Sequence, residues 1–581
     1  MSYASQLAAD QRTPVSLLRI TLDSCDRTFG TSPCLASGSK CYNTRHTCVY
    51  TTAYLNTTGK VHRFTSNDAP LPFKDGERPY LLAVRPMPTE IDETRTITSR
   101  VQVQLLDEPD TDVGVDPYVS SRSSVQGTFW QKLLARNPNY KGRQVELLEG
   151  FTGEPEANFA TKFVGFIERI YLRRGRVTLE VVDRIKDLTT IFWPPKLGLR
   201  LRLALADTDV VVNLEQHDDF AALPASGHIL VNDEVIAYSS KSSTAYSLAV
   251  SARGEWGTVA ADHDLGDRVG RAIYYSPRTA KNMLGQVMTD NGLVANVDYD
   301  LTALTAIGAN LFPTPLLEGK LAKPERLDVL LFELAWHADS YMWVGEALKL
   351  TFTRKLPNQS GRIYHTLTDG ANFVLHSISG DMKDEDRRTR VELYWNRDVL
   401  AEDNETPEDF RRLAVAWNAE SESADLYDGQ QIETVFSRWL YTTAESDLDA
   451  YVRKVNRFAV RQQMRLNEAP IEIEGQVELK DQDVHTGSWC MVSTDRLTDI
   501  HGNPLTNQRF VVIRREVIGN KIQLRLRRTS LRKFCIIAPS SYSSKTWATA
   551  TEAERDYGAI ANAAPNYGKM DQNGNDGYIL A

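Results

Sequence analysis

Apolar and polar residues alternate along much of the first 200 positions, and a period of two is typical of half-buried β-strands. The clearest example is TSRVQVQLLDE at 98–108. Further strands are expected at 143–148, 161–167 and 176–182. The strands at 161–167 and 176–182 are expected to form a hairpin that turns at Arg174-Gly175-Arg176. A helix is expected at 128–136. The order strand, helix, strand, strand predicts a β-barrel with one helix across it.

Residues 205–270 have a different pattern, with short alternating stretches separated by Gly and Asn-Asp turns. This predicts a small β module inserted between larger units. His263 lies between Asp262 and Asp264, which could suggest a catalytic pair. Because no nucleophile is near in sequence, we expect a solvated turn there.

Helical spacing returns after this module. Ser276-Pro277 predicts a helix start, because a capping side chain precedes the residue that suits the first turn. A second helix is expected at 325–338, with Trp336 and His337 as a buried or half-buried pair at its end. The first helix carries an apolar stripe of Ala280, Met283, Leu284, Val287 and Met288.

The carboxyl-terminal half is again rich in β-branched and aromatic residues. A polar, acidic excursion is expected at 400–430, a helix at 444–460 and a hairpin turn at Gly519-Asn520. Strands are expected at 341–345, 347–354, 373–382, 387–398, 470–479, 487–494 and 509–528. These elements predict a second β-rich domain followed by an extended tail.

Composition narrows the class of protein. With 581 residues, 42% hydrophobic and 25% charged, the chain is expected to be globular and to hold several domains. The net charge of −9 makes it a poor candidate for wrapping nucleic acid. No apolar run reaches the roughly 20 residues of a membrane helix, and no secretory pattern opens the sequence. We therefore expect folding in a reducing cytoplasm.

Four of the six cysteines, Cys25, Cys34, Cys41 and Cys48, fall in one turn-rich window with few large apolar residues. Such a segment cannot form a hydrophobic core of its own and needs a cross-link, such as a disulfide or a metal, to stabilise it. Disulfides would suit an exported protein. Four thiolates could also bind zinc, although the gaps are wider than in zinc knuckles, or an iron–sulfur cluster. The spacing favours a metal and leaves zinc and iron–sulfur open, with His46 as an alternative ligand.

Signatures of catalysis are missing from the sequence. No phosphate-binding loop, HExxH helix or GxSxG elbow is present. Cys490 has His485 nearby, but adjacency in sequence is weak evidence for a catalytic pair. We therefore do not expect an enzyme.

Several segments, in this order, resemble the tail-tip or baseplate hub proteins of long-tailed bacteriophages and gene-transfer agents. The loop 25–48 resembles their cysteine-rich segment, and 227–240 with 253–269 is similar to a small β module of tail proteins. Segments 330–354 and 387–398 resemble the α/β hub domain, and 502–528 and 573–580 resemble hub carboxyl termini. The module pattern matches at Arg253, Gly254, Gly257, Thr258, Ala260, His263 and Gly266.

This resemblance implies a multidomain, mainly β fold with α+β elements. It comprises two tail-tube-like β-barrels, a small inserted β module and an α/β hub domain. The implied domains are a first barrel at 1–200 with the cysteine loop, the module at 201–275, the hub domain at 276–360, a second barrel at 361–535 and a tail at 536–581.

The resemblance also implies a structural virion protein at the tail tip. Three copies would present six barrels to a sixfold tail tube and pass threefold symmetry to a central fibre or spike. Expected neighbours are the distal tail protein ring and the tape measure protein, with contact to the host envelope during infection. Phage DNA would pass through the lumen without specific binding, and the four cysteines would hold an iron–sulfur cluster, of the 4Fe–4S type, with zinc as the alternative.

Two other readings stay open. A tail-associated cell-wall hydrolase would act on peptidoglycan. A host-surface-binding tail protein would expose the module at 205–270 as its contact element.

Overall fold

The protein is described here by a computed structural model. It describes residues 13–528 except 36–40, 67–76, 87–88, 92–99, 123–125, 183–187, 309–314, 346–348, 356–363, 402–405, 419–421, 423–428, 443–447, 467–468, 499–501 and 519–520. The expected tail at 536–581 and the turn at Gly519-Asn520 lie outside these residues. Within them, no helix is both long and apolar enough to span a bilayer.

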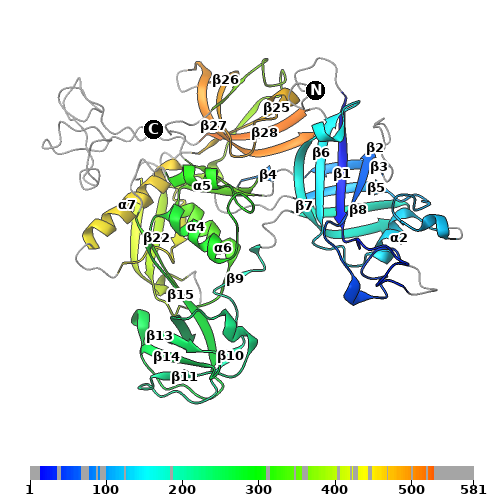
Figure 1. Ribbon diagram of the computed structural model, residues 1–581. Helices are drawn as coiled ribbons and strands as arrows, with labels where there is room; N and C mark the ends of the chain where they lie inside the picture. The colour runs from blue at the N-terminus through cyan, green and yellow to red at the C-terminus, as the bar shows by residue number, and fades with distance from the viewer. Residues whose placement is uncertain are drawn as a thin grey trace.

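Seven strands close into a barrel in the order β1-β2-β3-β5-β8-β7-β6, at the right of Figure 1. The predicted barrel and its hairpin are confirmed, since Arg174 and Gly175 turn between β7 and β8 with φ of 46° and 76°. The strands are β1 (Pro14–Leu22), β2 (Lys60–Ser66), β3 (Glu77–Pro86), β5 (Arg100–Leu106), β6 (Gln144–Phe151), β7 (Ala160–Arg173) and β8 (Arg176–Val182).

The predicted helix, α2 (Phe129–Arg136), supplies the large aromatic side chains of the barrel's core. Trp130 is fully buried and stacks on Phe64 of β2 with ring centroids 5.2 Å apart. Phe129 meets the same Phe64 ring edge-on. The helix therefore fills the barrel by packing aromatic rings rather than by polar contacts.

The small β module is present and has its own apolar core (Figure 1, lower part). Its sheet has the order β10-β15-β12-β13-β14-β11. The strands are β10 (Leu199–Arg200), β11 (Val211–Asn213), β12 (Gly227–Val231), β13 (Glu234–Ser242), β14 (Ser247–Ala252) and β15 (Arg268–Arg278). Ser276 and Pro277 still belong to β15, so the helix start predicted there is wrong and α4 begins only at Ala280.

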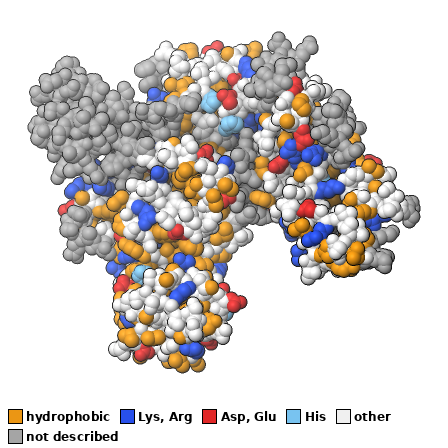
Figure 2. All heavy atoms as spheres, in the orientation of Figure 1, with side chains coloured by type: hydrophobic (Ala, Val, Ile, Leu, Met, Phe, Trp, Pro, Cys, Tyr) orange, Lys and Arg blue, Asp and Glu red, His pale blue; other side chains and the backbone are white. Residues whose placement is uncertain are grey.

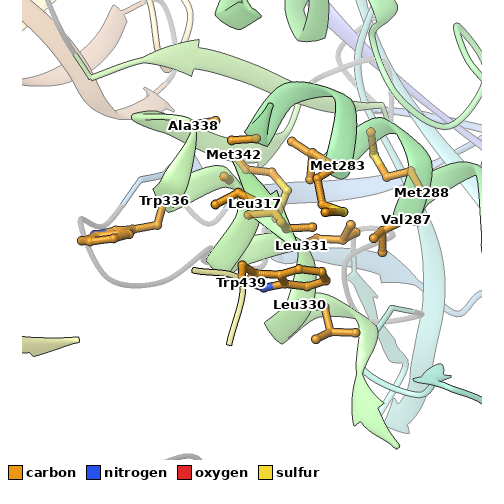
Figure 3. Packing of buried hydrophobic residues seen from close by; sticks show 14 of the residues in the cluster. Met283, Val287, Met288, Leu317, Leu330, Leu331, Trp336, Ala338, Met342 and Trp439 are labelled. Carbon is orange, nitrogen blue, oxygen red and sulfur yellow. The ribbon is translucent and has the colours of Figure 1, made fainter. Parts of the chain in front are cut away.

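Helices α4 (Ala280–Asp290), α5 (Leu301–Gly308), α6 (Leu327–His337) and α7 (Leu448–Arg465) share one large core. All five residues of the predicted α4 stripe are buried, as are Trp336 and His337. Figure 3 shows Met283, Val287, Met288 and Trp336 among the side chains of this core. The strands nearby are β9 (Phe192–Trp193), β16 (Leu317–Leu321), β17 (Glu325–Arg326), β18 (Ser340–Val344), β19 (Leu350–Arg354), β22 (Arg390–Arg397), β23 (Phe410–Trp417) and β24 (Ile432–Phe436).

This core differs from the sequence expectation in two ways. Residues 400–430 were expected as a polar excursion, but they contain β23, whose Ala414 and Ala416 are buried against α7. The buried face of this strand carries small alanines while the larger Leu413, Val415 and Trp417 are exposed, so a search for buried large apolar residues does not recognise it. The range 361–535 is also divided, because β22–β24 and α7 pack with α4 and α6 rather than with the second sheet.

The second large sheet has the order β20-β26-β27-β28-β25-β21 and is a half-barrel in the described residues. Its fully buried side chains include Cys490, Phe510 and Leu524. The strands are β20 (His365–Thr368), β21 (Ser379–Met382), β25 (Ile471–Glu478), β26 (Trp489–Thr498), β27 (Pro504–Ile518) and β28 (Lys521–Arg528).

A short strand of the first domain, β4 (Thr89–Glu90), joins the two barrel-type sheets. It pairs with Arg514 and Arg515 of β27, beyond the point where β26 ends its own pairing. The amide of Ile91 donates to the carbonyl of Ile513 at 2.7 Å, and the Ile91 side chain is buried. A segment that leaves the barrel between β3 and β5 thus adds a short strand to the second sheet.

We predict that Trp130→Ala selectively destabilises the first barrel. Removing a fully buried indole costs about 3–5 kcal/mol, so amide protection of β1 and β5 should fall while that of β13 in the module is retained. Hydrogen–deuterium exchange with peptide resolution measures both. Leu172→Ala on β7, a partly exposed position, serves as the control and should leave protection unchanged.

Candidate functional site

The four predicted ligand cysteines all lie in the connection between β1 and β2, at the lower end of the barrel (Figure 1, dark blue). Cys25 and Cys34 are buried, and Cys41 and Cys48 are half-buried. None of the four forms a disulfide in the described chain. The connection therefore depends on hydrogen bonds and on packing against a neighbouring loop.

Asn43 organises the connection from its centre. It adopts the left-handed conformation with φ of 58°, which asparagine tolerates better than most residues. Its carbonyl accepts from the amide of Cys25 at 2.6 Å, and its side-chain amide donates to the Cys25 carbonyl at 3.0 Å. Its own backbone amide points at the sulfur of Cys41 at 3.4 Å. One residue thus holds two of the cysteines together.

The next contact joins the cysteine connection to the segment before α2. The ring of Tyr42 lies between two guanidinium groups, with Arg122 at 3.8 Å and Arg136 at 4.1 Å from its centroid. Arg122 pairs with buried Asp116 at 2.5 Å and also donates to the carbonyl of Cys41. Arg136 pairs with Asp112 at 2.8 Å. Cation–π contacts of this kind stabilise most when they are desolvated, as here.

The thiols influence one another electrostatically. Burial raises the pKa of Cys41, the Asn43 amide opposes this, and the neighbouring Cys48, Cys25 and Cys34 raise it further. The structure therefore brings all four thiols into one neighbourhood. Within the described residues, however, no three His, Cys, Asp or Glu side chains form a group that could hold a metal ion. The donor chemistry suits zinc or iron–sulfur, while the positions are wider than a closed site requires.

A second cluster of charged groups, in the β module, was not expected from the sequence. Glu234, at the start of β13, is almost completely buried. Arg253 donates to both of its carboxylate oxygens, at 2.6 and 2.7 Å, and His263 lies 2.9 Å from one of them. The amides of Gly254 and Ala261 complete the shell at 3.0 and 3.1 Å. Every oxygen lone pair of this carboxylate thus faces a donor.

The expectation for His263 is therefore wrong. It is not a solvated turn residue, since it is buried and in contact with the Glu234 carboxylate. Neighbouring Asp262 and Asp264 are exposed and conceal this from the local sequence. The available signal was the single acidic residue at the start of the apolar segment EVIAY, because an acid in that position needs buried partners.

This cluster also has a defined ionisation state. Burial alone would raise the pKa of Glu234, but the hydrogen bonds from Arg253, His263, Ala261 and Gly254 outweigh it and lower the pKa to about 2. The carboxylate therefore stays charged over the whole physiological range. Its role is to hold loops in place rather than to transfer protons.

Cys490 does not support a catalytic reading. It is fully buried in β26 among Val492, Phe510 and other apolar side chains. Burial raises the pKa of its thiol, which suppresses the nucleophilic thiolate. The second lone cysteine of the sequence, Cys535, lies outside the described residues.

Comparisons with known proteins found similar chains among solved structures. No family model matches the sequence, and no curated protein does. Among solved structures, a tail protein from Neisseria meningitidis is similar with 12% identity over 82% of this chain and 95% of that one, at a TM-score of 0.37. A prophage MuSo2 tail protein from Shewanella oneidensis is 9% identical over 78% of this chain and 94% of its own, at a TM-score of 0.36. The virion of a native gene transfer agent contains a similar chain, with 15% identity over 46% of this chain and 82% of that one, at a TM-score of 0.19.

We predict that the β module loses stability in acid because of Glu234. A lowered pKa stabilises the folded module fully above the ordinary value of 4.5, and this stabilisation is lost as the pH falls toward about 2. The protection of the β12 and β13 amides, corrected for the intrinsic exchange rate at each pH, should fall over this interval. Glu234→Gln should exchange faster at neutral pH and show a flatter pH dependence, whereas Glu215→Gln, at an exposed position, should match the wild type. Equal pH profiles for wild type and Glu234→Gln would contradict the assignment.

Proposed function

We propose that this protein is a structural virion component, the trimeric tail-tip hub of a long-tailed phage or gene-transfer agent. In this role it adapts a sixfold tail tube to a threefold central fibre or spike. Its expected neighbours are the distal tail protein ring and the tape measure protein. The proposal assigns no catalytic turnover to the chain.

The observation that carries the proposal is that a segment from the first domain pairs with the second barrel-type sheet. Through β4 and Ile91, one chain holds a closed barrel and a half-barrel next to each other. Three such chains would supply six barrel units, the number that a sixfold tube requires. Closed rings of this kind need contacts between different faces of neighbouring copies.

The edge strands of the half-barrel also support assembly with neighbouring subunits. In the described residues β20 and β21 end the sheet, and each has a partner on one side only. Exposed sheet edges favour pairing with further strands, so natural proteins seldom leave them uncovered. A neighbouring tail subunit could pair with such an edge by strand addition.

The charge of the chain suits a conduit. A net charge of −9 disfavours tight binding of phosphate groups, so DNA could pass the ring without being held. This supports a lumen through which DNA passes without sequence-specific contacts to the protein.

The four cysteines would hold an iron–sulfur cluster, or zinc, that staples the β1–β2 connection. Supporting this, Cys25, Cys34, Cys41 and Cys48 lie in one neighbourhood and are free thiols. A bound cation would favour the thiolate form of Cys41, which burial and the neighbouring thiols disfavour. Binding would need the connection to tighten around the ion, as metal binding and folding are coupled in small loops.

The assembly prediction is that purified full-length protein forms a trimer of about three times 65.4 kDa in native mass spectrometry. In particles, an antibody label on the chain should mark the tail tip alone in electron micrographs. The tail-tip proposal is wrong if the label runs along the tube or is absent from particles. A monomer in solution together with tip labelling would contradict only the self-assembling trimer.

The metal prediction concerns protein purified without oxygen, analysed for iron, zinc and acid-labile sulfide. We expect iron and sulfide bound to the wild type, and their loss in Cys41→Ser together with faster amide exchange in β1 and β2. Cys490→Ala, in a separate core, should keep the metal. Zinc without sulfide would show that the site binds zinc and not an iron–sulfur cluster. Unchanged metal content in Cys41→Ser would exclude the four-cysteine site.

A further inference from the structure

Two loops at one end of the β module expose large aliphatic side chains. The first, residues 202–211, precedes β11, and the second, 258–266, leads into β15. They lie at the end where β15 begins, while the other end of β15 continues into α4 (Figure 1). The exposed fractions are 54% for Leu203, 69% for Val210, 79% for Val259 and 66% for Leu265. Residues 202–211 and 258–266 are called the two-loop surface below.

The two loops are joined to each other along their length. Leu205 and His263 exchange backbone hydrogen bonds of 2.9 and 2.8 Å, and the amide of Leu201 donates to Asp267 at 2.9 Å. Leu203 and Leu265 lie in the middle of the stretch between these two contacts. The amide of Asp207 donates to the side chain of Asp262 at 2.8 Å. Leu203 and Leu265 therefore lie on adjoining, hydrogen-bonded segments. Figure 2 shows hydrophobic atoms at the lower end of the module.

The buried Glu234 cluster holds this surface from beneath. Arg253, paired with Glu234, also donates to the carbonyl of Ala206 at 2.6 Å in the first loop. It donates to the carbonyl of Ala261 at 2.8 Å in the second loop. One guanidinium thus ties both loops to one carboxylate. Side chains that are fixed before binding lose less entropy when a partner docks, so the arrangement suits recognition.

The charged residues around the aliphatic side chains restrict the chemical class of a binding partner. The two loops carry four exposed aspartates, Asp207, Asp209, Asp262 and Asp264, against the single Arg202. Such a rim repels nucleic acid and anionic lipid. It also disfavours a symmetric dimer through this surface, because the two acidic rims would face each other. Neither loop contains Phe, Tyr or Trp, the usual platforms for stacking.

From this surface we infer a protein-docking site whose partner presents Leu, Ile or Val side chains bordered by Lys or Arg. Aliphatic contact supplies the affinity, and the acidic rim selects a basic partner and accelerates its approach. The site goes beyond the proposed hub role and does not depend on it, because the module could carry it in any assembly.

The test selects a displayed library of random dodecapeptides on immobilised full-length protein, with a Leu203→Asp, Leu265→Asp variant as counter-selection. We expect enriched peptides that combine Leu, Ile or Val with Lys or Arg. A synthetic peptide from the enriched set should bind about tenfold or more weakly to the counter-selection variant. Its affinity should also fall with rising salt and in Asp207→Asn, Asp264→Asn, which removes rim charge.

Two controls distinguish binding at this site from nonspecific hydrophobic binding and from misfolding of the variants. Val294→Asp, Val297→Asp changes exposed aliphatic residues outside the surface and should bind the peptide like wild type. Amide exchange of β12 and β13 must be the same in all variants, so a binding loss is not an unfolding effect. Incorporation of the variants into particles is scored separately, which keeps this inference distinct from the hub role.

Four outcomes would overturn the inference. These are no enrichment over the counter-selection variant, enrichment of acidic or purely aromatic peptides, and self-association in sedimentation that the Leu203→Asp, Leu265→Asp variant abolishes. The fourth is binding of the wild type to phosphatidylglycerol vesicles that this variant loses, because the surface would then recognise lipid.

Discussion

The three largest units of the chain meet in one small apolar cluster around Ile91. Ile91 follows β4 of the first domain, Tyr341 and Trp343 come from β18 of the central core, and Trp489, Val511 and Ile513 come from the second sheet. Each side chain in this cluster is nearly inaccessible to water. Because β4 also hydrogen-bonds to β27, the cluster combines apolar burial with strand pairing. The relative placement of both barrel-type sheets depends on this contact.

Two turn-rich segments of the chain are stabilised in different ways. In the β module, one carboxylate with five hydrogen-bond donors organises two loops, and removing a single partner would leave a buried charge uncompensated. In the β1–β2 connection, Asn43 bonds to Cys25 and faces the Cys41 sulfur, and the Arg122–Tyr42–Arg136 stack joins the connection to the rest of the domain. The first segment is therefore organised by one buried charge, and the second by an asparagine and by cation–π contacts.

Sequence periodicity predicted those elements whose burial is local. The stripe of α4 and the helix α2 were predicted because each buries one face at helical spacing. Periodicity failed where a distant partner decides the structure. β4 is two residues long and is a strand only because β27 pairs with it, and β23 is held by α7. His263 was misjudged for the same reason, since its partner Glu234 lies 29 residues away.

The β module is joined to the central core by a continuous strand and a small apolar cluster. β15 runs without a break from Arg268, beside the two-loop surface, to Arg278, and its second half pairs with β16 of the central core. Val235 and Ala272 of the module pack against Ala322 and Val399 of the core, so the joint is dry as well as hydrogen-bonded. A continuous strand shared by two sheets resists bending more than a loop would. Any rotation of the module against the central core would therefore disturb the pairing of β15 with β16, where a Cβ at Gly319 would clash with the Trp439 ring.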